Sequence, residues 1–240
     1  MGLHSDEKHV TYAASKKYAE LAVWEWAEAH PDVDVTASKS IMTLFLPLNL
    51  SYEPHWTVLP AYIYGPFADK FPPLPKPDFD TLSSTLMIYN LLFPTGVYLP
   101  RFGYVDFRDV ARVHVGALDS KPDKKNKRIM VASPHGLTNK HVLDIIKKEH
   151  PELERRFITA PLLDFPYNVL DVEFERLEEI TGMRKEDFHT LEEVCCIWLF
   201  NYAWTWLFFQ TISDTVNNLL KIEEEWKKNG YNVTEVPPFI

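Results

Sequence analysis

The sequence predicts an α/β fold, in which strands and helices pack in layers. Short segments rich in β-branched and aromatic residues alternate along the chain with longer segments of helical periodicity. Hydrophobic residues make up 46% of the chain and charged residues 25%, as in ordinary globular proteins. The 240 residues are enough for one domain with a substantial core and part of a second.

The first 93 residues are expected to form two helices and two strands. In chain order these are a helix at 11–30, strands at 33–36 and 57–64, and a helix at 81–93. Several alanines favour the first helix, and Pro31 ends it. Gly65 and Pro66 end the second strand, and the proline-rich segment 67–79 is expected to be an irregular loop.

The remainder of the chain is expected to add two strands and four helices. These are a strand at 104–106, a helix at 107–120, a strand at 128–132, and helices at 138–150, 173–180 and 211–229. Asp106 and Thr138 are suited to cap the helices that follow them. Gly182 and Gly230 stand where glycine commonly ends a helix.

Composition argues against several classes of protein. The net charge of −9 disfavours nucleic-acid binding, and the basic run 121–128 is expected to be a solvated loop. Cys195 and Cys196 are adjacent, and neither they nor the nine histidines show a metal-ligand spacing, so no metal is expected. The N-terminus is polar and does not resemble a signal peptide, which favours a cytoplasmic protein.

The segment Thr11–Lys17, TYAASKK, is the first candidate for chemistry. Tyr12 and Lys16 are four residues apart, so their side chains project together from a helix. A nearby ammonium group stabilises a tyrosinate, which suits Tyr12 to protonate a carbonyl oxygen while a hydride arrives at carbon. Taken alone, this pair is more often part of a surface helix.

Two further segments carry a pattern of their own. Residues 57–66, TVLPAYIYGP, predict a buried strand followed by a Tyr-Gly-Pro turn. Residues 103–118, GYVDFRDVARVHVGAL, predict a short strand followed by a helix, with Arg108 and Asp109 able to form local ion pairs. Each segment alone is explained by structure as well as by function.

Together and in this order, the segments resemble the extended short-chain dehydrogenase/reductases, a family of NAD(P)-dependent oxidoreductases. The similarity is to the branch of dihydroflavonol reductases, cinnamoyl-CoA reductases and fungal aldehyde/ketone reductases. YAASKKYAE resembles the catalytic helix of that branch, and VLPAYIYGP the strand and loop behind the nicotinamide. The run from DTLSSTLMIYNLL to GYVDFRDVARVHV resembles a substrate-domain helix and the strand–helix unit after it.

The resemblance implies the C-terminal part of a Rossmann-like NAD(P)-binding fold together with a small α/β substrate domain. Residues 1–66 would be a remnant of the Rossmann domain, and residues 67–240 mainly the substrate-binding domain. Within the second range, the strand and helix at 104–120 would return to the Rossmann part.

The resemblance also implies roles for eight residues. Tyr12 is expected to be the catalytic acid/base, and Lys16 to hold the nicotinamide ribose and assist Tyr12. The resemblance implies six more cofactor-binding residues. Those expected to face the nicotinamide are Pro60, Ala61, Tyr62 and Ile63, and those expected at the edge of the cofactor or substrate are Ser83 and Ser84. The expected reaction is hydride transfer between a small aldehyde or ketone and NADP, with NAD as the alternative cofactor.

The sequence departs from the family pattern before Tyr12. The family begins with a strand and a GxxGxxG turn that receives the cofactor pyrophosphate, and no such motif occurs among the eight glycines here. The family's catalytic Ser or Thr lies a few tens of residues before the tyrosine, so Ser5 is too close. We therefore expect an N-terminally truncated chain with an internal start at Met1, and little or no activity from it as it stands.

Two segments are expected to be insertions, at 37–56 and 194–210. The second begins with valine, whose codons start GT, and ends with glutamine, one of whose codons is CAG. A retained intron is therefore expected there, and its uncharged aromatic run predicts poor solubility. A membrane anchor is the weaker interpretation, because the run is shorter than about 20 residues. The alternative to an enzyme is a non-catalytic fragment that binds another protein.

Overall fold

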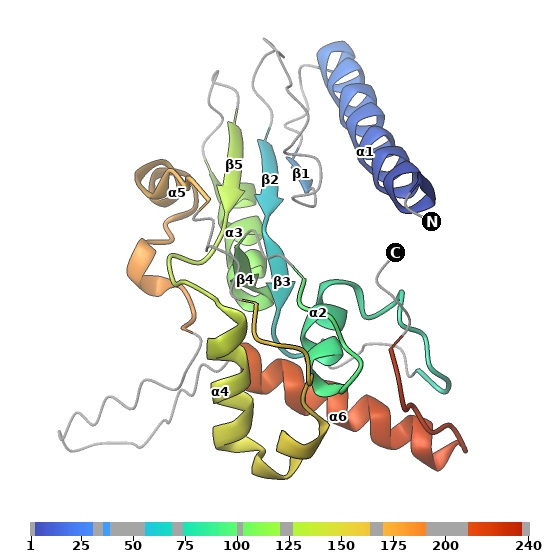
Figure 1. Ribbon diagram of the computed structural model, residues 1–240. Coiled ribbons are helices and arrows are strands. Elements are labelled where there is room, and N and C mark those ends of the chain that lie inside the picture. Colours follow the sequence, from blue (N-terminus) through green and yellow to red (C-terminus); the bar gives the residue numbers. More distant parts are fainter. Residues whose placement is uncertain are drawn as a thin grey trace, which may run out of the picture.

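The computed structural model describes residues 3–30, 36–38, 56–68, 74–99, 103–120, 127–163, 170–190 and 211–236. These residues form a mixed α/β structure with small parallel sheets at its centre (Figure 1). The run 194–210 and residues 39–55 lie outside the described ranges.

The strands in the described ranges form two parallel sheets. The first has the order β1 (Thr36–Ser38), β2 (Trp56–Pro60) and β5 (Lys127–Val131), and the second pairs β3 (Tyr62–Tyr64) with β4 (Tyr104–Asp106). Only Ala61 separates β2 from β3, and its N–H donates to the carbonyl of Val131 at 2.9 Å. The chain therefore pairs first with β5 and then, beyond Ala61, with β4.

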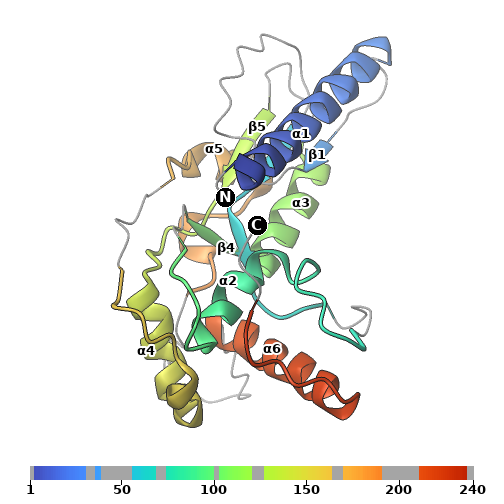
Figure 2. The same ribbon diagram turned by 45° about the vertical axis from the view of Figure 1, so that its right-hand side comes forward.

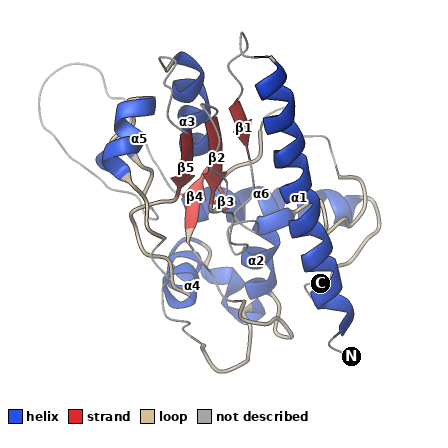
Figure 3. Ribbon diagram, turned by 90° about the horizontal axis from the view of Figure 1, so that it is seen from above, coloured by secondary structure: helices blue, strands red, loops and turns tan. Residues whose placement is uncertain are grey.

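Helix α3 (Phe107–Asp119) packs on these strands and on α5 (Phe174–Thr181). Gly116 permits the close approach of the two helices, since a Cβ atom there would lie 2.5 Å from the carbonyl oxygen of Thr181. A hydrophobic cluster that includes Val58, Val113 and Leu177 fills the space between β2, α3 and α5. Figure 3 shows α3 and α5 on the same side of the strands.

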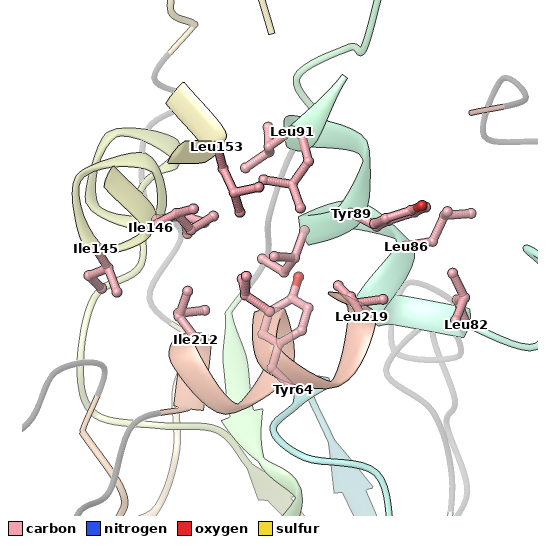
Figure 4. Close-up of a cluster of buried hydrophobic side chains, with 14 of the residues drawn as sticks. Tyr64, Leu82, Leu86, Tyr89, Leu91, Ile145, Ile146, Leu153, Ile212 and Leu219 are labelled. Carbon is pink, nitrogen blue, oxygen red and sulfur yellow. The ribbon is translucent and has the colours of Figure 1, made fainter. Parts of the chain in front are cut away.

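A second and larger cluster lies among α2 (Leu86–Tyr89), α4 (Asn139–Glu149) and α6 (Thr211–Lys228). Figure 4 shows its side chains converging from these helices on Tyr64, at the end of β3. The short 3-10 helices at Ser83–Thr85, Asn90–Leu92 and Pro151–Arg156 flank this cluster, and another lies at Lys185–Asp187. Helices from both halves of the chain thus pack around the end of β3.

Helix α1 (Leu3–Ala29) stands on the β1 side of the first sheet, as Figures 1 and 2 show. Its buried side chains include Glu20 and Ala27, seven residues apart and therefore on one face. The hydroxyl of Thr57 in β2 donates to Glu20 Oε1 at 3.5 Å, which is a long hydrogen bond.

Most expected elements are present with shifted ends. The first helix extends from Leu3 to Ala29, and the expected helix at 81–93 is a run of short 3-10 and α-helical turns from Ser83 to Leu92. The expected strand at 57–64 is interrupted at Ala61. The edges of the first expected insertion belong to strands, because Ala37 and Ser38 lie in β1 and Trp56 begins β2.

Candidate functional site

The carboxyl ends of β3 and β4 meet at one edge of the second sheet. The two strands are parallel, with Ile63 opposite Val105 and Tyr64 opposite Asp106. In open α/β structures ligands bind beyond the carboxyl ends of the strands, because loops and helix N-termini gather there. This edge contains the end of the segment 60–63 that the sequence predicts to face a nicotinamide.

Ser84 lies against this edge. Its hydroxyl donates to the carbonyl oxygen of Ile63 at 2.6 Å, so the structure brings together two residues that are predicted to bind cofactor. Ser83 is exposed and has a φ of 49°, the positive-φ non-glycine residue among those described. Left-handed backbone is costly for residues with a Cβ atom, and such strain often accompanies ligand sites.

The other predicted strand residues are held mainly by backbone bonds. Pro60 ends β2 opposite Val131, and Ala61 is buried beside the smaller hydrophobic cluster. Tyr62 is partly buried and lies opposite Tyr104 in the register of β3 and β4. The segment is therefore bonded to β5 up to Ala61 and to β4 beyond it.

Tyr12 and Lys16 lie together on α1. The Lys16 ammonium is 5.3 Å from the centre of the Tyr12 ring, and Tyr12 is 38% exposed. Glu20, the next residue in the same i, i+4 series, is the one that reaches Thr57. Figure 1 shows α1 standing apart from α2, the helix that follows Ser83 and Ser84.

A buried polar network occupies the edge formed by β3 and β4. Asp106, fully buried, accepts hydrogen bonds at Oδ1 from Arg108 N and Nε and at Oδ2 from Arg108 Nη2, at 2.7–2.8 Å. Thr211 Oγ1 donates to Asp106 Oδ2 at 2.8 Å, and Arg108 Nη1 pairs with Asp214 at 2.8 Å. Burial alone would lower the pKa of Arg108, but its bonds to Asp106 and the charge of Asp214 raise it.

The first turn of α3 holds a second buried pair, Asp109 and His189. His189 N donates to Asp109 Oδ2 at 2.8 Å, and its Nδ1 lies 2.6 Å from Asp109 Oδ1. Arg112 lies 3.8 Å from the same carboxylate and donates to the carbonyl of Asp187 at 2.9 Å. These contacts attach the segment before residue 191 to α3.

Sequence reasoning missed the contacts of Asp106 and Asp109 with the C-terminal part of the chain. It assigned Asp106 a capping role, which is confirmed by the Arg108 N–H bond, but Thr211 is 105 residues away. Within the described residues, no group of three or more His, Cys, Asp or Glu side chains is placed to hold a metal ion. No helix there is long and apolar enough to cross a membrane.

A crystal structure of Gre2 from Candida albicans has a similar fold. It matches with a TM-score of 0.55 and 22% sequence identity, over 88% of this chain and 52% of that protein. The chain therefore has an α/β fold of the Rossmann-like type seen in that structure. No protein-family profile matches the sequence.

Two curated relatives are similar in sequence. An NADPH-dependent methylglyoxal reductase, GRE2 of Saccharomyces cerevisiae, is 26% identical over 216 residues, which cover 88% of this chain and 51% of that protein. An uncharacterised oxidoreductase of Schizosaccharomyces pombe is 30% identical over 152 residues, which cover 62% of this chain and 37% of the relative. The chain thus spans about half the length of these relatives, or less.

Proposed function

We propose that this chain belongs to the NADPH-dependent carbonyl reductases of the extended short-chain dehydrogenase/reductase type. The observation that carries the proposal is the similarity to the Saccharomyces cerevisiae methylglyoxal reductase over 88% of the chain. The proposed substrate class is a small aldehyde or ketone, with methylglyoxal as the first compound to test. A cytoplasmic location accompanies the proposal.

In the proposed reaction, NADPH supplies a hydride to the carbonyl carbon. Tyr12 donates the proton to the carbonyl oxygen, and Lys16 stabilises the tyrosinate and holds the nicotinamide ribose. The position of the Lys16 ammonium 5.3 Å from the Tyr12 ring supports a working pair. The backbone from Pro60 to Ile63 would face the nicotinamide, with Ser83 and Ser84 at the edge of cofactor or substrate.

The proposed domain division follows from the same roles. Residues 1–66 and 104–120 would form the cofactor-binding part, and most of residues 67–240 the part that holds the substrate. The separate hydrophobic clusters around β2 and around α6 support two units, but the cluster around β2 also includes residues beyond these ranges, such as Ile129 and Leu177.

The 240 residues by themselves are proposed to bind NADPH weakly. They contain no GxxGxxG turn, and this turn with the helix after it provides the backbone N–H groups that bind a pyrophosphate. The missing motif also favours a second candidate function, a binding protein without a cofactor site. NADPH titration followed by fluorescence separates the two candidates once a segment that contains the GxxGxxG turn is joined to the chain.

In the test, the part of Candida albicans Gre2 that this chain does not match is joined to the N-terminus of the 240 residues. We expect this fused enzyme to oxidise NADPH when methylglyoxal is added, and the 240-residue chain alone to be inactive. A fused enzyme that folds and binds NADPH but reduces no aldehyde or ketone would contradict the proposal. A folded fusion that binds no NADPH would favour the binding protein.

A further inference from the structure

The start of α6 is hydrogen-bonded to the loop that follows β3. Thr215 is fully buried, and its Oγ1 accepts a hydrogen bond from Gly65 N at 2.7 Å although the two residues are 150 positions apart. The same hydroxyl donates back to the carbonyl of Thr211, one helical turn earlier, at 2.7 Å. The hydroxyl is thus oriented by its own helix to receive the Gly65 N–H.

The same helical turn also holds the end of β4. Thr211 donates to Asp106, and Asp214 pairs with Arg108, whose side chain lies along the Asp106 carboxylate. Hydrogen bonds of charged groups are shorter and stronger than neutral ones, and Asp106 is fully buried. Thr211, Asp214 and Thr215 therefore form a clamp, from one turn of α6, on the carboxyl ends of both parallel strands.

Gly65 is suited to this clamp by its lack of a side chain. Its φ is +125°, and a Cβ atom there would lie 2.9 Å from the Phe107 ring and 3.3 Å from Asp106 Oδ2. The turn therefore lies directly on the start of α3. A shift of Gly65 would move the Ile63 carbonyl that Ser84 contacts, because only Tyr64 separates the two residues.

We propose that the clamp positions the end of β3 for the reaction, and that Thr215 is its central positioning residue. This inference rests on the proposed function, in which the backbone up to Ile63 faces the nicotinamide. Thr215 touches neither cofactor nor substrate; it acts through the Gly65 N–H. Effective reaction depends on sub-ångström placement of the reacting atoms, so a loosened strand end would slow turnover more than it weakens binding.

The first test compares Thr215→Val, which removes the hydroxyl at nearly constant volume, with Thr215→Ser, which keeps it. Hydrogen–deuterium exchange is measured in the full 240-residue chain on peptides that cover residues 58–68. We expect Thr215→Val to speed exchange of the Gly65 amide about fivefold or more, as the loss of one buried hydrogen bond does. Thr215→Ser should exchange like the wild type.

A second variant guards against misfolding of the first. Asp214→Asn keeps Thr215 but removes the charge pair with Arg108, and its side chain is 33% exposed. It should speed exchange in the same peptides by less than Thr215→Val. Folded variants with unchanged exchange at residues 58–68 would overturn the inference.

The kinetic test uses the fused enzyme. Thr215→Val should lower kcat about tenfold or more while the KM for methylglyoxal changes little, and Thr215→Ser should restore kcat. Faster exchange with an unchanged kcat would overturn the positioning role alone. A parent fusion that binds NADPH without any turnover would overturn the positioning role together with the proposed function.

Discussion

Replacing Arg156 with methionine should destabilise the protein far more than replacing Lys227, although both cations bind the same carboxylate. Glu223 on α6 is 3% exposed, and Arg156 donates to its two oxygens at 3.0 and 2.9 Å. Lys227 lies 2.7 Å from the same group but is 52% exposed. Tyr89 also donates to Glu223, at Oε2, at 3.2 Å.

The expected difference follows from burial and geometry. Each charge-assisted hydrogen bond contributes about 1.5–3 kcal/mol, but Arg156 is partly exposed and Lys227 remains, so the loss for Arg156→Met should be about 3 kcal/mol. An exposed ion pair contributes about 0.5 kcal/mol, which is the loss expected for Lys227→Met. At about 2–4 °C per kcal/mol in a chain of this size, Tm should fall by roughly 6–12 °C and by about 1–2 °C respectively.

Thermal unfolding followed by circular dichroism measures both variants against the wild type. The double variant Arg156→Met/Lys227→Met measures the coupling free energy between the two cations. Equal shifts in Tm for the two single variants would refute the reasoning, because Arg156 would then contribute no more than an exposed charge.

Three further predictions concern the same fold. Burial alone would raise the pKa of Glu223, but its bonds to Arg156 and Lys227 lower it. The stability that this carboxylate contributes should therefore be fully present above the ordinary pKa of 4.5 and be lost as pH falls through the lowered pKa of the folded state. Urea titrations at several pH values should show that Glu223→Gln loses less stability in acid than the wild type does. Gly65→Ala should cost more than about 2 kcal/mol in urea unfolding, against about 1 kcal/mol for Gly230→Ala, whose φ is +87° but which has open space around it; equal costs would exclude the clash. Deletion of residues 194–210 should preserve Tm and reduce light scattering; a deletion variant that does not fold would contradict the insertion.

The last of these predictions has a structural basis at both ends of the segment. Thr211 Oγ1 donates to the carbonyl oxygen of Thr190 at 3.2 Å. The described segments that end at Thr190 and begin at Thr211 are therefore in direct contact. His189 is attached to α3 through Asp109, and Thr211 to Asp106. Both ends are therefore held by contacts that do not involve the segment between them.

Local features of the fold could be predicted from the sequence because their causes are local. Asp106 and Thr138 cap helices through N–H groups two and three residues away, and Gly182 closes α5 with a φ of +70°. The break at Ala61 was missed, because strand propensity does not show that the chain changes its neighbour from β5 to β4 there. Pro60, which has no N–H to donate, ends β2 at this point.

The candidate site was predictable only in part. The spacing of Tyr12 and Lys16 is enough to place both on one helical face, as the structure has them. The contact of Ser84 with Ile63 and the clamp of α6 on Gly65 join residues 21 and 150 positions apart, and no periodicity encodes such contacts. The catalytic and cofactor-binding roles of all these residues stay predictions.

The role of Tyr12 is tested most directly by Tyr12→Phe in the fused enzyme, with Tyr18→Phe as the control. Tyr18 lies on the same helix and is 69% exposed. Loss of a general acid lowers turnover by about 10²–10⁴-fold. The kcat of Tyr12→Phe for methylglyoxal reduction should therefore fall by about that factor, while the variant binds NADPH as the parent does. The kcat of Tyr18→Phe should equal that of the parent. A Tyr12→Phe enzyme that turns over at the parental rate would contradict the assignment of Tyr12 as the proton donor.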